Sequence, residues 1–116
     1  MRTTAWATTK LVGFHAWPNP PQHRDYLANR HRHLFHITVE AEVVDSIRIE
    51  HHDLKEAIES FWYTERGPQS CEQIAAELLD KVTRNWLSRL TDNWLYHPTT
   101  VIVSEDGEAG SRIFQP

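Results

Sequence analysis

The sequence predicts an α+β domain in which two strands are followed by two helices and then by two further strands. Two segments carry most of this prediction. Residues 33–44 alternate apolar and polar side chains, which is the period of a half-buried strand. Residues 74–90 place apolar side chains at every fourth position, which is typical of an amphipathic helix. These side chains are Ile74, Leu78, Val82, Trp86 and Leu90. We therefore expect a four-stranded sheet with two helices on one of its faces.

The first strand and the first helix are expected from composition. Thr3–Phe14 is rich in Thr, Trp, Val and Phe and stops before a cluster of prolines, which indicates a strand. Asp53–Trp62 has apolar side chains at helical spacing. Glu50 and Asp53 place negative charge at the start of this segment, where a helix dipole favours it. A helix is therefore expected over this range.

Turn and capping signals define the second half of the chain. Ser70 with Gln73 three residues later forms a capping box, so the second helix is expected to begin there. Thr99–Ser104 and Arg112–Phe114 are short strand-like runs on either side of the turn Glu105–Gly110. This arrangement predicts a hairpin.

Length and composition limit the classes of function. With 116 residues, of which 40% are hydrophobic and 24% charged, the chain is expected to be a single globular domain over residues 1–116. Its net charge of −4 does not favour nucleic-acid binding, although residues 23–33 interleave basic and aromatic groups as some nucleic-acid-binding segments do. We find no signal peptide and no membrane span, and a single cysteine, Cys71, fits a reducing cytoplasm.

The tryptophan content and the open sheet predict self-association. Two helices cover only one face of a four-stranded sheet, and its edges are free to pair. The five tryptophans strengthen this expectation, because aromatic residues are enriched at interfaces. They are Trp6, Trp17, Trp62, Trp86 and Trp94. The alternative is that most of them fill the core, which the helical stripe favours for Trp86. We expect a homo-oligomer.

Three histidines predict a metal site. His31 and His33 are two residues apart at the start of a strand, so their side chains project to the same face. His15 ends the preceding strand and supplies a third imidazole if the two strands are neighbours. Three histidine ligands leave one coordination position open, as catalytic zinc sites do. The alternative is chance, because the chain has eight histidines. Iron or nickel is a further alternative to zinc.

Five segments, in this order, resemble the tunnelling-fold family of 6-pyruvoyltetrahydropterin synthase and 6-carboxytetrahydropterin synthase. The family's first strand ends in FxAAH, its second begins with HGH, its helices open with DFxDLK and PTxEnlA, and a late strand ends in Glu. The similar segments here are LVGFH at residues 11–15, HRH at 31–33, EHHDLK at 50–55, QSCEQIA at 69–75 and VIVSED at 101–106. The resemblance implies a tunnelling fold with a four-stranded antiparallel sheet.

The resemblance also implies roles for individual residues. His15, His31 and His33 would bind zinc (Zn2+), and Glu105 would anchor a pterin through the N–H donors of its 2-amino-4-oxo ring. Glu72 would lie near the substrate, at sites between subunits. On its own, Glu105 reads as a solvated turn acid. Glu72 likewise reads as an acid favoured by the helix dipole.

Two departures from the family affect the reaction. Leu27 stands where the family has its catalytic cysteine, and no Asp-His pair lies between residues 61 and 70. Cys71 is a candidate replacement, because the first turn of a helix lowers the pKa of a thiol; the alternative is a small buried residue. His52 and Asp53 are second candidates for general acid–base work, or else exposed residues at a helix start.

The sequence therefore predicts a zinc-dependent lyase that resembles these synthases and acts on a pterin or purine-derived compound. The alternative is a non-catalytic relative that binds a pterin-like or guanine-like ligand. The missing cysteine and Asp-His pair favour this alternative.

Overall fold

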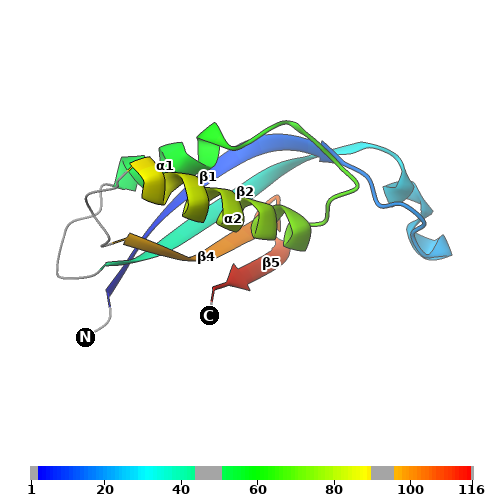
Figure 1. Cartoon of the computed structure of the whole chain (residues 1–116). Coiled ribbons are helices and arrows are strands. Elements are labelled where there is room, and N and C mark those ends of the chain that lie inside the picture. The colour runs from blue at the N-terminus through cyan, green and yellow to red at the C-terminus, as the bar shows by residue number, and fades with distance from the viewer. Residues whose placement is uncertain (1–2, 44–50, 90–95, 116) are drawn as a thin grey trace.

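The computed structural model describes residues 3–43, 51–89 and 96–115 and has an α+β architecture, as predicted (Figure 1). Both α-helices lie over the same face of one sheet (Figure 1). The elements in chain order are β1 (Thr3–His15), the 3₁₀ helix η1 (Gln22–Ala28), β2 (His31–Val43), α1 (His51–Ser60), β3 (Glu65–Gly67), α2 (Cys71–Arg89), β4 (Tyr96–Glu105) and β5 (Ala109–Phe114). Within the described ranges, no helix has the length and apolar character needed to cross a bilayer.

The sheet differs from the predicted four-stranded antiparallel sheet with two helices, and that detail of the prediction is wrong. The sheet has five strands in the order β3-β1-β2-β4-β5, and β3 runs parallel to β1. The structure also adds η1 as a third helix. Strand β3 is attached through backbone bonds, Phe14 N–H to Thr64 O at 2.9 Å and Ala16 N–H to Gly67 O at 2.9 Å. Three residues bonded in this way leave no alternating pattern in the sequence.

The register between β1 and β2 determines where the functional side chains lie. These strands pair without interruption from Thr3 opposite Val43 to His15 opposite His31. His33 lies opposite Gly13, where a Cβ atom would come within 2.8 Å of the Phe35 ring. The missing side chain at Gly13 therefore lets that ring pack close to β1. Strand β1 ends at His15 and strand β2 begins at His31, so both strands include histidines of the candidate site. These polar side chains interrupt the apolar–polar alternation that predicts a strand from the sequence.

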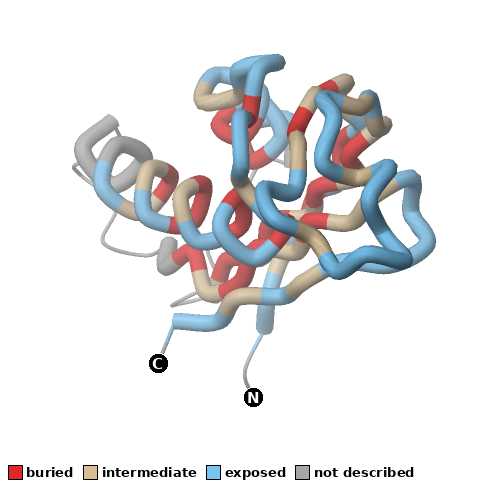
Figure 2. The backbone as a smooth tube through the Cα atoms, turned by 90° about the vertical axis from the view of Figure 1, so that its right-hand side faces the viewer, coloured by how far each residue is buried: buried red, intermediate tan, exposed pale blue. Residues whose placement is uncertain are grey.

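The core lies between the sheet and the two helices. Every second residue of β2 is fully or almost fully buried from Phe35 to Ala41, which confirms the predicted alternation. In α2 the predicted stripe residues Ile74, Leu78 and Val82 have no exposed surface. The side chain of Trp86, together with Leu90 and Trp94, lies outside the described part of the chain. Figure 2 shows buried positions recurring along helices and strands, whereas η1 has no buried residue.

Two local predictions are confirmed in atomic detail. The Ser70 N–H donates to Gln73 Oε1 at 2.9 Å and the Gln73 N–H donates to Ser70 Oγ at 3.2 Å, so the capping box forms before α2. Strands β4 and β5 form the predicted hairpin, with Glu105 opposite Ala109. The capping box fixes the start of α2 beside the end of β1, and the hairpin brings residue 105 to the same end of the sheet.

Candidate metal centre

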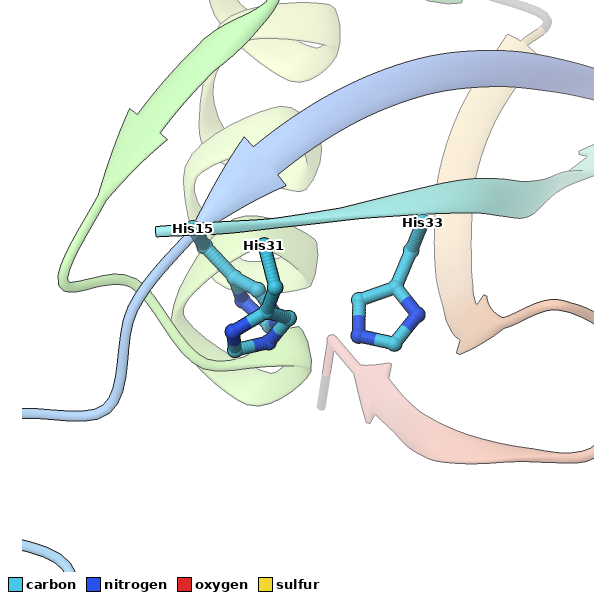
Figure 3. A group of neighbouring side chains, drawn as sticks. All are labelled: His15, His31 and His33. Carbon is cyan, nitrogen blue, oxygen red and sulfur yellow. The ribbon is translucent and has the colours of Figure 1, made fainter. Parts of the chain in front are cut away.

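The three predicted metal ligands converge at one end of the β1–β2 pair. Their rings hang from the same side of the two strands (Figure 3). Ring centroids lie 4.6 Å apart for His15 and His31, 5.1 Å for His15 and His33, and 4.9 Å for His31 and His33. One potential ligand nitrogen from each residue lies within 4.8 Å of the other two. The structure therefore brings together a group that can hold one metal ion.

The hydrogen bonds of the histidines indicate which nitrogen of each ring is available. Each Nδ1 lies 2.8 Å from an oxygen that only accepts: the carbonyl of Gln69 for His15, the carbonyl of Asn29 for His31, and Oδ2 of Asp106 for His33. Each Nδ1 must therefore carry the proton. The lone pair of a neutral ring is then on Nε2, as required of a metal ligand whose ring is held by an outer hydrogen bond.

Burial supports the same assignment. His15 is only 7% exposed, and this burial lowers its pKa against the opposing effects of the Gln69 carbonyl and the Glu105 carboxylate. The Nε2 atoms of His15 and His33 are buried and have no hydrogen-bond partner. A buried Nε2 without a hydrogen-bond partner can serve as a ligand for a divalent cation. These residues therefore fit the zinc ion that the sequence predicts.

Phe35 forms an apolar wall behind the histidines. Its side chain is fully buried, and its ring lies edge-on to His15 at 5.3 Å and to His33 at 5.7 Å between centroids. On its other side it packs against Trp62 at 5.5 Å, and the Trp62 indole N–H donates to the carbonyl of Val12 at 2.9 Å. Phe35 therefore packs between the core and the two histidine rings and restricts the movement of those rings.

Asp106 is predicted to orient His33. Its Oδ1 accepts from the Leu34 N–H at 2.9 Å while its own N–H donates to the Leu34 carbonyl at 2.8 Å. The hydrogen bond from His33 lowers the pKa of Asp106, so the carboxylate is charged at neutral pH. We expect Asp106→Asn to weaken zinc binding about tenfold, because the amide is a poorer acceptor for Nδ1–H. Unchanged affinity in a chelator competition assay would show that the contact is not needed.

A cavity of about 320 Å³ opens beside the histidines. Its walls come from the end of β1, η1, the start of α2 and the β4–β5 hairpin. The lining residues that bear on the candidate site are His15, His31, Leu27, Gln69, Cys71 and Glu105. Its size lies at the lower end of the range for small-molecule sites. The cavity is lined by a carboxylate, a thiol and two imidazoles and has the volume for one small compound.

Cys71 lies in this cavity, but its acidity differs from the expectation. It is 8% exposed and is hydrogen-bonded to the Glu105 carboxylate. Burial, together with the charge and hydrogen bond of Glu105, raises the pKa of Cys71 to about 12. The predicted lowering by the helix N-terminus is therefore wrong in direction, because desolvation of the thiolate outweighs the helix dipole. At neutral pH Cys71 is a thiol that donates a proton to a hydrogen bond.

Three other predicted site residues are not brought to the cavity. His52 and Asp53 are exposed in the first turn of α1, at the other end of the sheet in Figure 1. Glu72 is exposed beside Cys71 and does not line the cavity. Their proposed roles stay predictions. Glu50 lies outside the described residues.

Sequence reasoning missed the residues that hold the histidines. Two of the three Nδ1 partners are backbone carbonyls, of Gln69 and Asn29, which no side-chain pattern reveals. Asp106 was detectable in principle, as a second acid directly after the candidate Glu105 in a hairpin turn. Its φ of 57° is left-handed, a conformation that Asp tolerates better than most residues.

Comparison with models of protein families and with curated proteins finds no match for this chain. Its function is therefore argued from the geometry of the metal centre and cavity and from the sequence resemblance.

Proposed function

We propose that this chain is a zinc-dependent tunnelling-fold enzyme that acts on a pterin or a related purine-derived compound, in the manner of the 6-pyruvoyl- and 6-carboxytetrahydropterin synthases. The main support is the arrangement of three imidazoles whose Nδ1 atoms are all engaged, leaving three Nε2 atoms to face one point. The cavity beside them contains Glu105, the residue that the resemblance assigns to the pterin ring.

In this proposal one residue binds the ligand, and the three histidines hold the zinc ion that activates it. Glu105 offers two acceptor oxygens, which suit the paired N–H donors of a 2-amino-4-oxo ring. Zinc, when bound by the histidines, supplies Lewis-acid polarisation of a substrate side-chain oxygen, which acidifies the adjacent C–H. Cys71 lines the same cavity as Glu105, and its S–H is a donor to the carboxylate.

Cys71 remains the first candidate for proton transfer, as a proton donor only, because its raised pKa keeps it a thiol at neutral pH, and its loss is predicted to slow turnover. Cys71→Ala removes the S–H beside Glu105, and we expect turnover to fall by about two orders of magnitude, as for loss of a proton-transfer group. Cys71→Ser retains a hydroxyl donor and is expected to keep part of the activity. The measurement is steady-state turnover of a pterin that binds the zinc-loaded protein. Undiminished turnover in Cys71→Ala would eliminate this role.

One observation favours a second function, binding without catalysis. Leu27 lines the cavity at the position where the resembling family carries its nucleophile. An apolar side chain there contributes contact area but no chemistry. A relative that only holds a pterin-like or guanine-like ligand needs Glu105 and the cavity and no proton-transfer group. Tight binding of a pterin with no conversion of it would establish this second function.

We further propose that the chain associates with copies of itself and that it works in a reducing compartment. Strands β3 and β5 are the edges of the sheet, and Trp6 and Phe114 are 59% and 64% exposed. Unpaired strand edges and exposed aromatic rings are features of surfaces that associate. We propose a cytoplasmic homo-oligomer in which neighbouring copies complete the sites. The single cysteine is consistent with that compartment.

A thermal-shift screen tests the proposed function. Zinc-loaded protein is heated with pterins, deazapurines and guanine as separate probes, and a ligand at 100 times its Kd is expected to stabilise the fold by about 2.7 kcal/mol. His31→Ala is the matched variant with a damaged metal centre, and its response to the same ligand is expected to be smaller. If no pterin or purine raises the Tm of the zinc-loaded protein, the proposed ligand class is wrong.

A further inference from the structure

The contacts of Glu105 with the histidines do not have the geometry of ordinary hydrogen bonds. Its Oε1 lies 3.2 Å from His15 Nε2 and its Oε2 lies 3.5 Å from His33 Nε2. A charge-assisted N–H···O bond is shorter, about 2.7–2.9 Å. Because both Nδ1 atoms carry the protons, these Nε2 atoms are acceptors, and they face an acceptor-only carboxylate. A proton or a metal ion between the two groups removes the repulsion, and the separations of 3.2 and 3.5 Å are longer than those of a charge-assisted hydrogen bond and so favour a metal ion.

The same distances match those between ligands of one ion. With metal–ligand bonds of about 2.0–2.2 Å, two ligand atoms of a tetrahedral site lie about 3.3–3.5 Å apart. The two contacts of Glu105 are close to this spacing, and they join its two oxygens to two of the three imidazoles, those of His15 and His33. The backbone of Glu105 is fixed by pairing with Phe35 and Ala109, whereas its side chain is 39% exposed.

We propose that Glu105 is a displaceable fourth ligand of the cation held by His15, His31 and His33. This inference rests on the metal centre of the proposed function and adds a role to the residue that would bind the pterin. In the ligand-free protein the carboxylate closes the coordination position that three histidines leave open. A compound with paired N–H donors competes for the same two oxygens and draws the carboxylate away. Ligand binding itself then opens the coordination position beside the compound.

The exchange depends on groups already placed around Glu105. Cys71 contributes a hydrogen bond to the carboxylate from the cavity side, so the side chain has a partner other than the cation. Asp106 is the next residue and binds His33 Nδ1, so the hairpin that carries Glu105 also orients one of the histidines. One turn in this way positions both the Glu105 carboxylate and the His33 imidazole.

Metal binding to Glu105 variants tests the inference without any organic ligand. Zinc affinity is measured by competition with a chromophoric chelator for the unmodified protein and for Glu105→Gln and Glu105→Ala. We expect both variants to bind zinc about tenfold more weakly or worse, since even outer contacts are worth this much. Glu108→Gln is the matched control, because it is an exposed acid of the same hairpin turn with the same change of charge. Its affinity is expected to equal that of the unmodified protein.

Cobalt(II) supplies a second readout, independent of affinity. Its visible absorption reports coordination number and ligand type, so the spectrum of Glu105→Ala is expected to differ from that of the unmodified protein, while that of Glu108→Gln does not. Identical cobalt spectra and identical zinc affinities for Glu105→Ala and the unmodified protein would overturn the inference and leave the three-histidine centre standing. Failure of the unmodified protein to bind zinc at all would overturn both.

Discussion

Replacing Phe35 by Ala is expected to lower the free energy of unfolding by about 3–5 kcal/mol, the usual cost of removing a buried aromatic ring. The side chain has no exposed surface and packs against Trp62 in the core. Its ring also lies beside His15 and His33. The space left by the missing ring is therefore expected to let both imidazoles change their orientation. Chemical denaturation measures the first effect, and zinc affinity of the folded fraction measures the second.

The matched control for this variant is Ile37→Ala. Ile37 is the next inward-facing residue of β2 and is equally buried, so its truncation costs about 2–5 kcal/mol. Ile37 lies opposite Thr9 of β1 and Val103 of β4, farther along the sheet from the histidine end than Phe35. Its zinc affinity is therefore expected to match that of the unmodified protein. Equal loss of zinc affinity in both variants would mean that Phe35 acts on the site only through global stability.

Glu77→Ala is expected to destabilise the fold by about 3 kcal/mol, because it leaves a buried guanidinium without its carboxylate. The Arg66 side chain has no exposed surface, and its Nη2 donates to Glu77 Oε2 at 2.8 Å. Tyr63, Gln69 and Lys81 contact the same carboxylate at 2.7–3.0 Å. Because the backbone carbonyl of Gln69 also binds His15 Nδ1, a loss of zinc affinity is expected to accompany the loss of stability.

The pH dependence of stability follows from the same carboxylate. Burial by itself raises the pKa of Glu77, but the hydrogen bonds from Gln69, Lys81 and Tyr63 and the charge of Arg66 outweigh it and lower the pKa to about 2. A carboxyl whose pKa is depressed in the folded state stabilises the fold above its unfolded pKa, about 4.3, and loses this contribution as the pH falls toward 2. Glu77→Gln is expected to flatten the stability profile in this window.

Asp80→Asn provides the comparison for the pH experiment. Asp80 is an exposed acid of α2 that pairs with Arg84 at 2.8 Å one turn away. Exposed pairs of this kind contribute less than about 1 kcal/mol. Its acid unfolding profile is expected to follow that of the unmodified protein. A Glu77→Gln profile that also follows the unmodified protein between pH 4 and 2 would show that the network around Arg66 does not depend on the charge of Glu77.

The sequence was informative where side chains repeat with the period of an element. The alternation of β2 and the apolar residues at every fourth position of α2 reflect burial against one core, and the structure buries those of these residues whose side chains it describes. The capping box was visible because both partners are side chains three residues apart. The convergence of His15 on His31 and His33 followed from adjacent strands and needed only the correct register.

The remaining features depend on contacts that leave no periodic signal. Strand β3 pairs through three residues of backbone, and η1 buries none of its side chains. The partners of the histidine Nδ1 atoms are two carbonyls and an acid 73 residues from His33. The acidity of Cys71 depends on burial and on Glu105, which come from different elements that only the fold brings together.

Zinc X-ray absorption on the purified, zinc-loaded protein examines the metal centre itself. One zinc ion per chain with three imidazole nitrogens at about 2.0–2.1 Å is the result expected from three converging imidazoles whose Nδ1 atoms are already hydrogen-bonded. His31→Ala, measured in parallel, is expected to lose an imidazole from the first shell or to bind no stoichiometric zinc. A protein that takes up no stoichiometric divalent cation, or one whose bound zinc has no imidazole neighbours, would contradict the assignment of His15, His31 and His33 as a metal centre.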